Sequence, residues 1–123
     1  MGSAGPGDLA TEDVFNPGHA NPRVASELAE AALSAAGVNV SVMRLPQVHD
    51  RVKQGVVTVA VAIAWEKGIS AYLGDGLNRW PAAPVGDVAR LYRLALEKGE
   101  PGARYHAVAE EGIAVREIAA VIG

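Results

Sequence analysis

The amino-acid sequence predicts an α/β domain in which a short parallel or mixed sheet is flanked by helices. Segments with helical spacing of apolar residues alternate with short segments rich in β-branched residues, and this order is typical of such sheets. Half of the 123 residues are apolar, which is enough for one hydrophobic core and little for two. We therefore expect one folded domain over residues 21–123. Residues 1–20 are predicted to form a flexible lead-in, because they combine Gly, Pro, Asp and Asn with few apolar side chains.

Composition excludes several classes of function. The net charge is −3 and the eleven basic residues are scattered, so the clustered cations that bind nucleic-acid phosphates are missing. There is no cysteine, and the three histidines lack metal-ligand spacing, so we expect neither a disulfide nor a metal site. The longest apolar run, residues 56–65, is well short of the about 20 residues of a membrane span. Residues 1–8 have no apolar stretch of a signal peptide, and we expect a cytoplasmic protein.

Residues 21–37 carry the clearest helix signals. Asn21 can cap the free amides of a first turn, and Pro22 lacks the amide hydrogen that would go unpaired there. Gly37 offers a left-handed stop. Apolar residues recur at every fourth position between them, at Val24, Leu28, Ala32 and Ala36. The Ala-rich composition suggests that this helix packs closely against a sheet.

A strand is predicted over residues 38–43, with three valines on one face. It runs into a Pro-containing loop that carries Arg44, His49 and Asp50. Polar side chains just past the carboxyl end of a strand mark the ligand edge of open α/β sheets, so this loop is the first place to expect function. His49 beside Asp50 is either a tuned base or a solvated side chain.

Residues 56–65 fit two structures. Their strict alternation of β-branched or aromatic residues with Ala and Thr is typical of a strand. Glu66, Lys67 and Gly68, which follow, form a good helix stop, and the Ala spacing also suits a helix. From the residues alone, both readings stay open.

The remaining elements are shorter. Residues 69–73 are predicted to form a strand that a Gly-Asp-Gly turn closes, and residues 104–109 a second strand. Asp87 can cap a helix that ends at Gly99 and has an apolar stripe of Val88, Leu91, Tyr92, Ala95 and Leu96. A last helix is predicted over residues 113–122, with Ile113, Ile118 and Val121 facing inward.

Several segments resemble one family in the same order. They are Ala-Ala-Gly followed by Val-x-Val-Ser-Val-x-Arg-Leu-Pro-x-Val-His, ending at His49, and the segments at residues 74–81, 87–97 and 105–112. This chain is similar to the carboxyl-terminal half of an extended or atypical short-chain dehydrogenase/reductase of the NAD-dependent epimerase and 3β-hydroxysteroid dehydrogenase type. The resemblance implies an incomplete Rossmann-like NAD(P)-binding domain over residues 21–123. It also implies a helix over residues 56–65, which we adopt.

Two working parts of that family are not recognisable in the sequence. A dinucleotide site needs a strand, a Gly-rich turn and a helix, and the glycines of residues 2–7 have neither a strand before them nor an amphipathic helix after them. The Tyr-x-x-x-Lys pair of the family would fall on His19 and Arg23. These two keep a titratable group and a cation at that spacing. They are either catalytic residues or, because the helix start at Asn21 leaves His19 outside the helix, surface residues.

The resemblance assigns further residues to a site. Pro46 and Val48 would lie beside the nicotinamide of NAD or NADP, although this chain alone could bind neither. His49 is a candidate substrate contact together with a later cluster of Asn78, Arg79 and Trp80. An arginine beside an indole could hold a carboxylate or a sugar-like substrate. The alternative is a purely structural role, in which Trp80 is a packing anchor under a loop.

Arg44 is expected to have a structural role in the family, tying its strand to carbonyls or to a carboxylate. The family histidine near position 84 is replaced by Pro84. Because of this departure, we have less reason to expect the full set of active-site residues of the family.

Two classes of function follow. The first is the substrate-side half of an NAD(P)-dependent oxidoreductase or epimerase that acts on a small molecule once completed and is inactive alone. The second is a non-catalytic binding or structural module, which could be dimeric. In both, the strand at 38–43 has a bare edge, which predicts a homodimer or a partner chain that covers it. Nucleic acid and membrane are not expected as partners.

Overall fold

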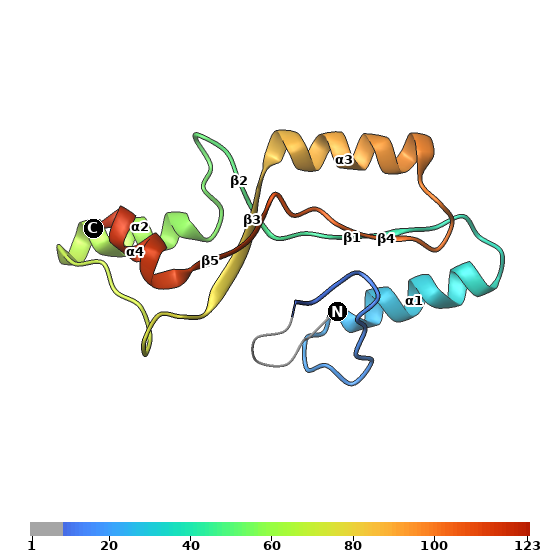
Figure 1. Cartoon of the computed structure of the whole chain (residues 1–123), viewed down its shortest axis with the longest axis horizontal. Helices are drawn as coiled ribbons and strands as arrows, with labels where there is room; N and C mark the ends of the chain where they lie inside the picture. The colour runs from blue at the N-terminus through green and yellow to red at the C-terminus, as the bar shows by residue number, and fades with distance from the viewer. Residues whose placement is uncertain (1–8) are drawn as a thin grey trace. The chain divides into compact units, whose positions relative to one another are not determined.

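The computed structural model describes residues 9–123 (Figure 1). The predictions made for residues 1–8 lie outside the described residues. The chain divides into two units. The first unit comprises the described residues up to Arg44 and the segment Leu91–His106, and the second comprises Leu45–Arg90 and Ala107–Gly123.

Helices and short strands alternate along the chain, as predicted for an α/β fold with a short mixed sheet. Their order is α1 (Val24–Ala35), β1 (Val42–Arg44), β2 (Gln47–His49), α2 (Val57–Lys67), β3 (Arg79–Pro84), α3 (Val85–Lys98), β4 (Arg104–His106), β5 (Glu110–Ala114) and α4 (Val115–Ile122). Within residues 9–123, no helix is both long enough and apolar enough to cross a membrane.

In the first unit, β1 and β4 form a parallel pair, with Val42 beside Arg104 and Arg44 beside His106. The predicted strand over residues 38–43 is therefore shorter at its start and extends to Arg44. Residues 38–41 have no strand beside them in the described chain. Their backbone bonds are from the Val38 amide to the Leu33 carbonyl, 3.0 Å long, and from the Gly102 amide to the Val40 carbonyl, 2.7 Å long. A ladder forms only where β4 supplies partners.

The inward face of α1 differs from the prediction. Val24 is buried, but Leu28 is 47% exposed, and the other buried side chains of the helix are Glu27 and Glu30. The four-residue apolar repeat therefore does not mark the packed face. Gly37 is the predicted left-handed stop, with φ +82°.

The start of α1 also differs by a few residues. The helix begins at Val24, and the Asn21 side chain accepts a hydrogen bond from the Arg23 amide at 2.9 Å, just before the first turn. The predicted cap is therefore wrong: Arg23 holds the N-cap position without a side-chain cap, and the Asn21 bond closes a local turn before the helix.

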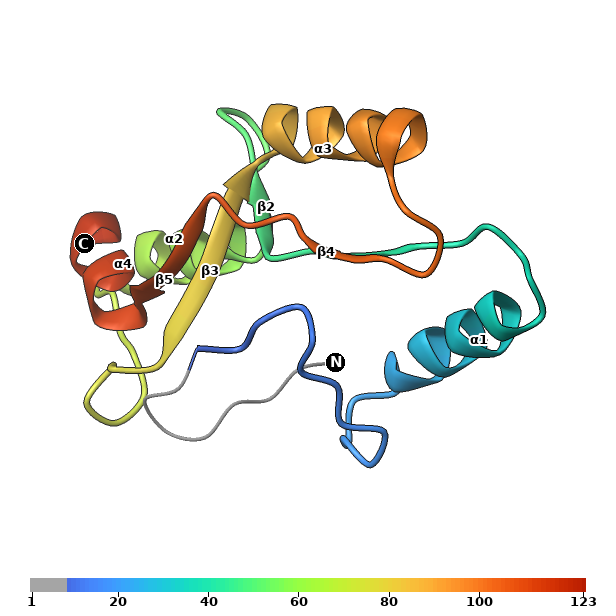
Figure 2. The same ribbon diagram turned by 45° about the vertical axis from the view of Figure 1, so that its right-hand side comes forward.

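In the second unit, β3 is the central strand of a three-stranded mixed sheet, parallel to β2 and antiparallel to β5. Figures 1 and 2 both show β5 running alongside β3. Neither β3 nor β5 was predicted. Prolines discourage a central strand, but Pro81 lies at a register shift between Trp80 and Ala82, and Pro84 ends the strand, which are positions that tolerate proline.

Residues 57–67 form a helix, α2, so the choice of helix over strand is confirmed. Gly68 ends it in the left-handed conformation, and the Gly68 amide bonds the Ala64 carbonyl at 2.8 Å. No residue of α2 is buried. The strand predicted over residues 69–73 is wrong, because this segment has no strand partner and leads directly into the predicted turn at Gly74.

The last two helices are shifted from their predicted bounds. α3 begins at Val85, so Asp87 lies in its first turn, where a negative charge still favours the helix dipole, and does not cap the helix. Along its predicted stripe Val88 is buried, whereas Leu96 is 87% exposed. α4 begins at Val115, because β5 takes up residues 110–114.

The inward faces of the last segment also differ from the prediction. Ile113 lies in β5, and Val121 is 88% exposed, whereas Ala119 is the buried residue of α4. The predicted strand over residues 104–109 ends at His106.

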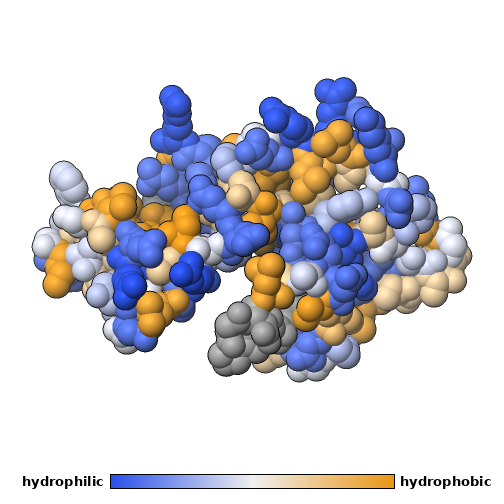
Figure 3. All heavy atoms as spheres, viewed as in Figure 1, coloured by the Kyte–Doolittle hydropathy of each residue, from blue (hydrophilic) through white to orange (hydrophobic). Residues whose placement is uncertain are grey.

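The buried apolar side chains are small. They are Val24, Ala83, Val88, Ala107, Ala114 and Ala119. Large apolar residues are instead exposed, among them Trp65 at 91% and Leu73 at 92%. Figure 3 shows hydrophobic residues in orange on the face in view, including the end of the second unit where α2 and α4 lie. Much apolar surface is therefore free in the described chain.

Candidate functional site

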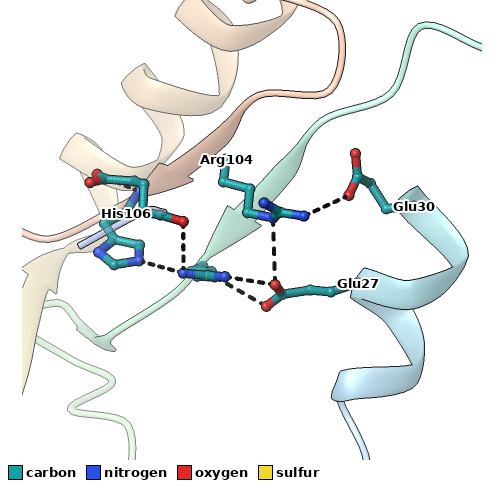
Figure 4. Close-up of polar contacts among 6 residues, drawn as sticks. Glu27, Glu30, Arg104 and His106 are labelled. Carbon is teal, nitrogen blue, oxygen red and sulfur yellow. Dashed lines mark hydrogen bonds and ion pairs between the residues drawn. The ribbon is translucent and has the colours of Figure 1, made fainter. Parts of the chain in front are cut away.

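Arg44 is the centre of a charged cluster in the first unit, and Figure 4 labels the cluster residues Glu27, Glu30, Arg104 and His106. Its Nη2 donates to Glu27 Oε2 at 2.7 Å and its Nε to Glu27 Oε1 at 3.1 Å, which gives a two-point contact between guanidinium and carboxylate. The side chains of Arg44 and Glu27 are only 12% and 5% exposed. This confirms the structural prediction for Arg44, which ties β1 to a carboxylate of α1.

Arg104 adds a second cation from β4. Its Nε lies 3.7 Å from Glu27 Oε2, and its Nη2 lies 3.7 Å from Glu30 Oε2. The guanidinium also lies over the ring of Phe15, 5.4 Å from the ring centre. Because α1 turns two carboxylates toward two arginines, charge pairing takes the place of an apolar contact between this helix and the strands.

The loop before α1 joins the same cluster through Glu12. The Glu12 carbonyl accepts a bond from Arg44 Nη1 at 3.2 Å, and the Glu12 carboxylate accepts one from the His106 amide at 3.3 Å. Arg44 Nη1 also lies 3.1 Å from His106 Nε2. An arginine can only donate, so in this contact the imidazole nitrogen is the acceptor.

The arginine contacts lower the pKa of Glu27. The hydrogen bond from Arg44 is the largest of the causes that lower this pKa to about 2, and burial opposes them. The pKa of Glu12 is also lowered, chiefly by hydrogen bonding with its own backbone. Both carboxylates therefore stay ionised at neutral pH, which suits a structural cluster better than proton transfer.

His19 and Arg23, the predicted acid/base positions, lie just before α1. His19 Nδ1 accepts a bond from the Asn21 amide at 3.0 Å, and the Arg23 amide donates to the Asn21 side chain. His19 lies outside the helix, as the predicted start at Asn21 implied, whereas Arg23 was expected in the first turn and is instead the residue before the helix. A catalytic role for either stays a prediction.

Pro46, Val48 and His49 belong to β2 or its approach in the second unit. β2 pairs in parallel with β3, so that Val48 lies beside Ala83 and His49 beside Pro84. Arg79 is at the opposite end of β3, five residues away from Pro84, which is about 16 Å along a strand. The structure therefore does not bring His49 together with Arg79 in one cluster.

Arg79 and Trp80 lie next to each other in β3, and successive strand residues point to opposite faces. Arg79 lies over Gly112 of β5 and donates from Nη1 to the Gly112 carbonyl at 2.7 Å. Trp80 faces a groove that Arg79 does not line. A substrate contact by Arg79 and Trp80 stays a prediction.

Asp50 is occupied by the backbone. Its carboxylate accepts bonds from the amides of Val52 and Lys53, and these bonds lower its pKa. The neighbouring His49 makes only a minor electrostatic contribution to that shift. The arrangement closes a turn after β2 and does not form the tuned His–Asp base that the sequence left open.

Asn78 and Trp80 open onto a groove of about 290 Å³ in the second unit. Its walls come from α2, α4 and the segment between α2 and β3, and they include Ile63, Tyr72 and Ile118. Asn78 immediately precedes β3 and Trp80 lies within it, and both line this groove. The sequence had indicated these two, but it gave no sign of the α2 and α4 wall, because those helices meet only in the tertiary structure.

A second hollow of about 730 Å³ adjoins this groove. It is lined by Trp65 of α2 together with Arg116 and Glu117 of α4. The two hollows share lining residues such as Tyr72 and Ala119. The groove at Asn78 and Trp80 is the better candidate site, because it is the one that contains sequence-predicted residues.

Two curated relatives match this chain over most of its length. A fission-yeast protein (Schizosaccharomyces pombe), "Uncharacterized protein C2A9.02", is 44% identical over 118 residues, which are 95% of this chain. A Saccharomyces cerevisiae protein, "Uncharacterized protein YLL056C", is 40% identical over 102 residues. This chain spans 40% and 34% of the lengths of these relatives. No family model matches the sequence.

Several solved structures have a similar fold. dTDP-glucose 4,6-dehydratase from Bacillus anthracis, in complex with NAD, is similar with a TM-score of 0.77 and 22% identity over 98% of this chain and 41% of its own. UDP-glucose 4-epimerase from Thermus thermophilus, also with NAD, has a TM-score of 0.70 and 26% identity over 98% of this chain and 43% of its own. RMD from Pseudomonas aeruginosa, with NADPH, has a TM-score of 0.69 and 24% identity over 97% and 44%.

The predicted resemblance is therefore confirmed at the level of the fold. The chain has the Rossmann-like fold of the short-chain dehydrogenase/reductases of the NAD-dependent epimerase type, and it corresponds to about two-fifths of such a protein.

The described residues do not fit the phosphates of a dinucleotide by themselves. The one stretch that runs from a strand to a helix with an intervening glycine, between β2 and α2, offers Gly55 alone, whereas the phosphate turn needs several glycines directly after a strand. A Cβ at Gly55 would meet the Val48 carbonyl oxygen at 2.8 Å, so this glycine serves close packing of the loop.

Proposed function

We propose that this chain is the substrate-side portion of an NAD(P)-dependent oxidoreductase or epimerase-like protein, and that it is inactive alone. The observation that carries the proposal is the extent of the likeness: 98% of this chain matches, whereas only 41% of the B. anthracis dehydratase is covered. The absence of a Gly-rich turn from the described strand-to-helix connections agrees with this reading. In the completed protein, the groove at Asn78 and Trp80 would hold a small-molecule substrate.

The test uses cofactor fluorescence. The 123-residue chain is titrated with NADH and with NADPH. The titration is repeated on a fusion in which this chain replaces the matching segment of the fission-yeast relative and the rest of that relative is kept in its own order. We expect no saturable change for the chain alone and saturable binding for the fusion. Binding by the chain alone, or none by the correctly folded fusion, would contradict the proposal. Comparing the two cofactors also decides between NAD and NADP.

A second candidate function is a non-catalytic, dimeric binding module. It is favoured by the exposed apolar residues of α2, such as Trp65, and by β1, which pairs only with β4 in the described chain. Light scattering coupled to size exclusion tests it. A dimer that leaves cofactor fluorescence unchanged, even in the fusion, would favour the module. A monomer would count against a homodimer, and a partner chain would then be the candidate that pairs with the open edge of β1.

A further inference from the structure

The groove lined by Asn78 and Trp80 in the second unit has no charged lining residue, whereas the cluster around Arg44 in the first unit is made of charged side chains. We propose that this groove binds an uncharged, mainly apolar ring compound, with Asn78 holding the polar group of that compound. This deepens the proposed function, on which the identification of the groove as a substrate site rests. The binding itself is measurable on the 123-residue chain without a cofactor.

The first argument is charge. None of the residues that line the groove is an Asp, Glu, Lys, Arg or His. Two cations adjoin lining residues in sequence: Arg79, which donates to the Gly112 carbonyl, and Arg116, which lines the adjoining hollow and not this groove. A phosphate or carboxylate that entered the groove would lose its hydration without gaining a cation, which is costly. The lining therefore selects against anionic ligands.

The second argument is the placement of polar groups. Four lining residues carry polar side-chain atoms, Ser70, Tyr72, Asn78 and Trp80, and the remaining lining side chains are apolar. In the described part of the chain, the carboxamide of Asn78 and the indole N–H of Trp80 have no hydrogen-bond partner. Ligand pockets commonly combine apolar walls with a few such groups that orient the ligand. A carbonyl, hydroxyl or amine on the ligand can therefore bond Asn78.

The third argument is size. The groove holds about 290 Å³, just below the usual range for ligand sites, which suits a compound of a few rings. Trp80 and Tyr72 provide aromatic surfaces for ring stacking. These features favour an aromatic or alicyclic compound over an extended chain.

The experiment uses two dyes that differ by one charge. N-phenyl-1-naphthylamine is neutral, and 8-anilinonaphthalene-1-sulfonate carries a sulfonate on the same ring system. A Trp65→Phe variant leaves Trp80 as the remaining tryptophan, so energy transfer to a dye reports proximity to the groove. We expect saturable transfer to the neutral dye, and binding of the sulfonate weaker by about tenfold or more. UDP-glucose should not displace the neutral dye.

A matched pair of variants separates the groove from the rest of the exposed apolar surface. Ala60 and Ala62 both lie on α2, but only Ala60 lines the groove. We expect Ala60→Leu to weaken neutral-dye binding by about tenfold, whereas Ala62→Leu should leave it unchanged. If Ala60→Leu alters the far-UV spectrum, Ala71→Leu, which also fills the groove, replaces it. Asn78→Ala should weaken binding by about threefold, and Asn78→Ser should restore part of it.

The inference is overturned if the neutral dye does not bind, or if both dyes bind with equal affinity. It is also overturned if UDP-glucose displaces the neutral dye, or if Ala60→Leu and Ala62→Leu have equal effects. A fusion that binds NADH while the groove binds no neutral dye would overturn this inference and leave the proposed function standing. Dye binding with the expected charge and variant pattern, in a fusion that never binds a cofactor, would support the groove and overturn the proposed function.

Discussion

Helices α1 and α2 are held in opposite ways. In the first unit, α1 buries Glu27 and Glu30 against Arg44 and Arg104, and leaves Leu28 half exposed. In the second unit, α2 is almost wholly apolar, yet none of its residues is buried. The difference teaches that apolar spacing alone does not identify the packed face of a helix. A buried carboxylate is held when guanidinium groups meet it, and an apolar helix stays exposed when nothing large covers it.

Removing the cation of the cluster should have the largest effect. Arg44→Met keeps the bulk of the side chain but leaves Glu27 buried beside an apolar group, which should lower the free energy of unfolding by about 3–5 kcal/mol. Urea unfolding followed by far-UV circular dichroism measures it. Arg93→Met is the control, because Arg93 and Glu97 form an exposed pair that should contribute below about 0.5 kcal/mol. Equal losses in both variants would show that the cluster does not hold α1.

Acid should weaken the first unit through Glu27. The pKa of this carboxyl falls from 4.5 to about 2 in the folded state, so its contribution is fully present above pH 4.5 and is lost as the pH falls toward 2. The shift corresponds to about 3 kcal/mol. Unfolding by urea at a series of pH values measures the loss. In Glu27→Gln the dependence over this pH range should be flatter, and an unchanged slope would remove Glu27 as its source.

The second unit should depend on Gly76 and not on buried charge. Gly76 has φ +66°, and a Cβ there would come within 2.7 Å of the Arg116 Cβ. Gly76→Ala should therefore cost about 2–3 kcal/mol. Gly74 has φ +60° but open space around it, so Gly74→Ala should cost about 1 kcal/mol.

Tryptophan emission follows the unfolding of these variants, because both tryptophans, Trp65 and Trp80, lie in the second unit. Similar costs for the two alanine variants would argue against the close packing of Gly76.

The exposed face of α2 should show the smallest effect. Trp65 is 91% exposed, so Trp65→Gln should change the free energy of unfolding by less than about 0.5 kcal/mol. Thermal unfolding followed by circular dichroism measures it. A loss well above this value would mean that Trp65 is covered in solution, by a second copy or by another part of a longer protein. Repeating the measurement at several protein concentrations separates these two covers.

The sequence alone determined the local features of this protein. Gly37 was predicted as a left-handed helix stop, Gly68 as part of a helix stop and Gly74 as part of a turn, and the α/β order was predicted from alternating periods. These features depend on residues close in the chain, because φ preferences and caps act within a few residues. Even so, the choice of helix for residues 56–65 needed the family resemblance, since the alternation there fitted a strand equally well.

Only the tertiary structure decided which side chains meet. The partner of Arg44 is 17 residues away in sequence and the partner of Arg79 is 33 residues away. β5 begins with two glutamates and a glycine, so its composition did not announce a strand, and pairing with β3 made it one. The groove at Asn78 and Trp80 likewise needed α2 and α4 to meet. Burial and pairing depend on contacts between distant segments, and a pattern within one segment does not contain them.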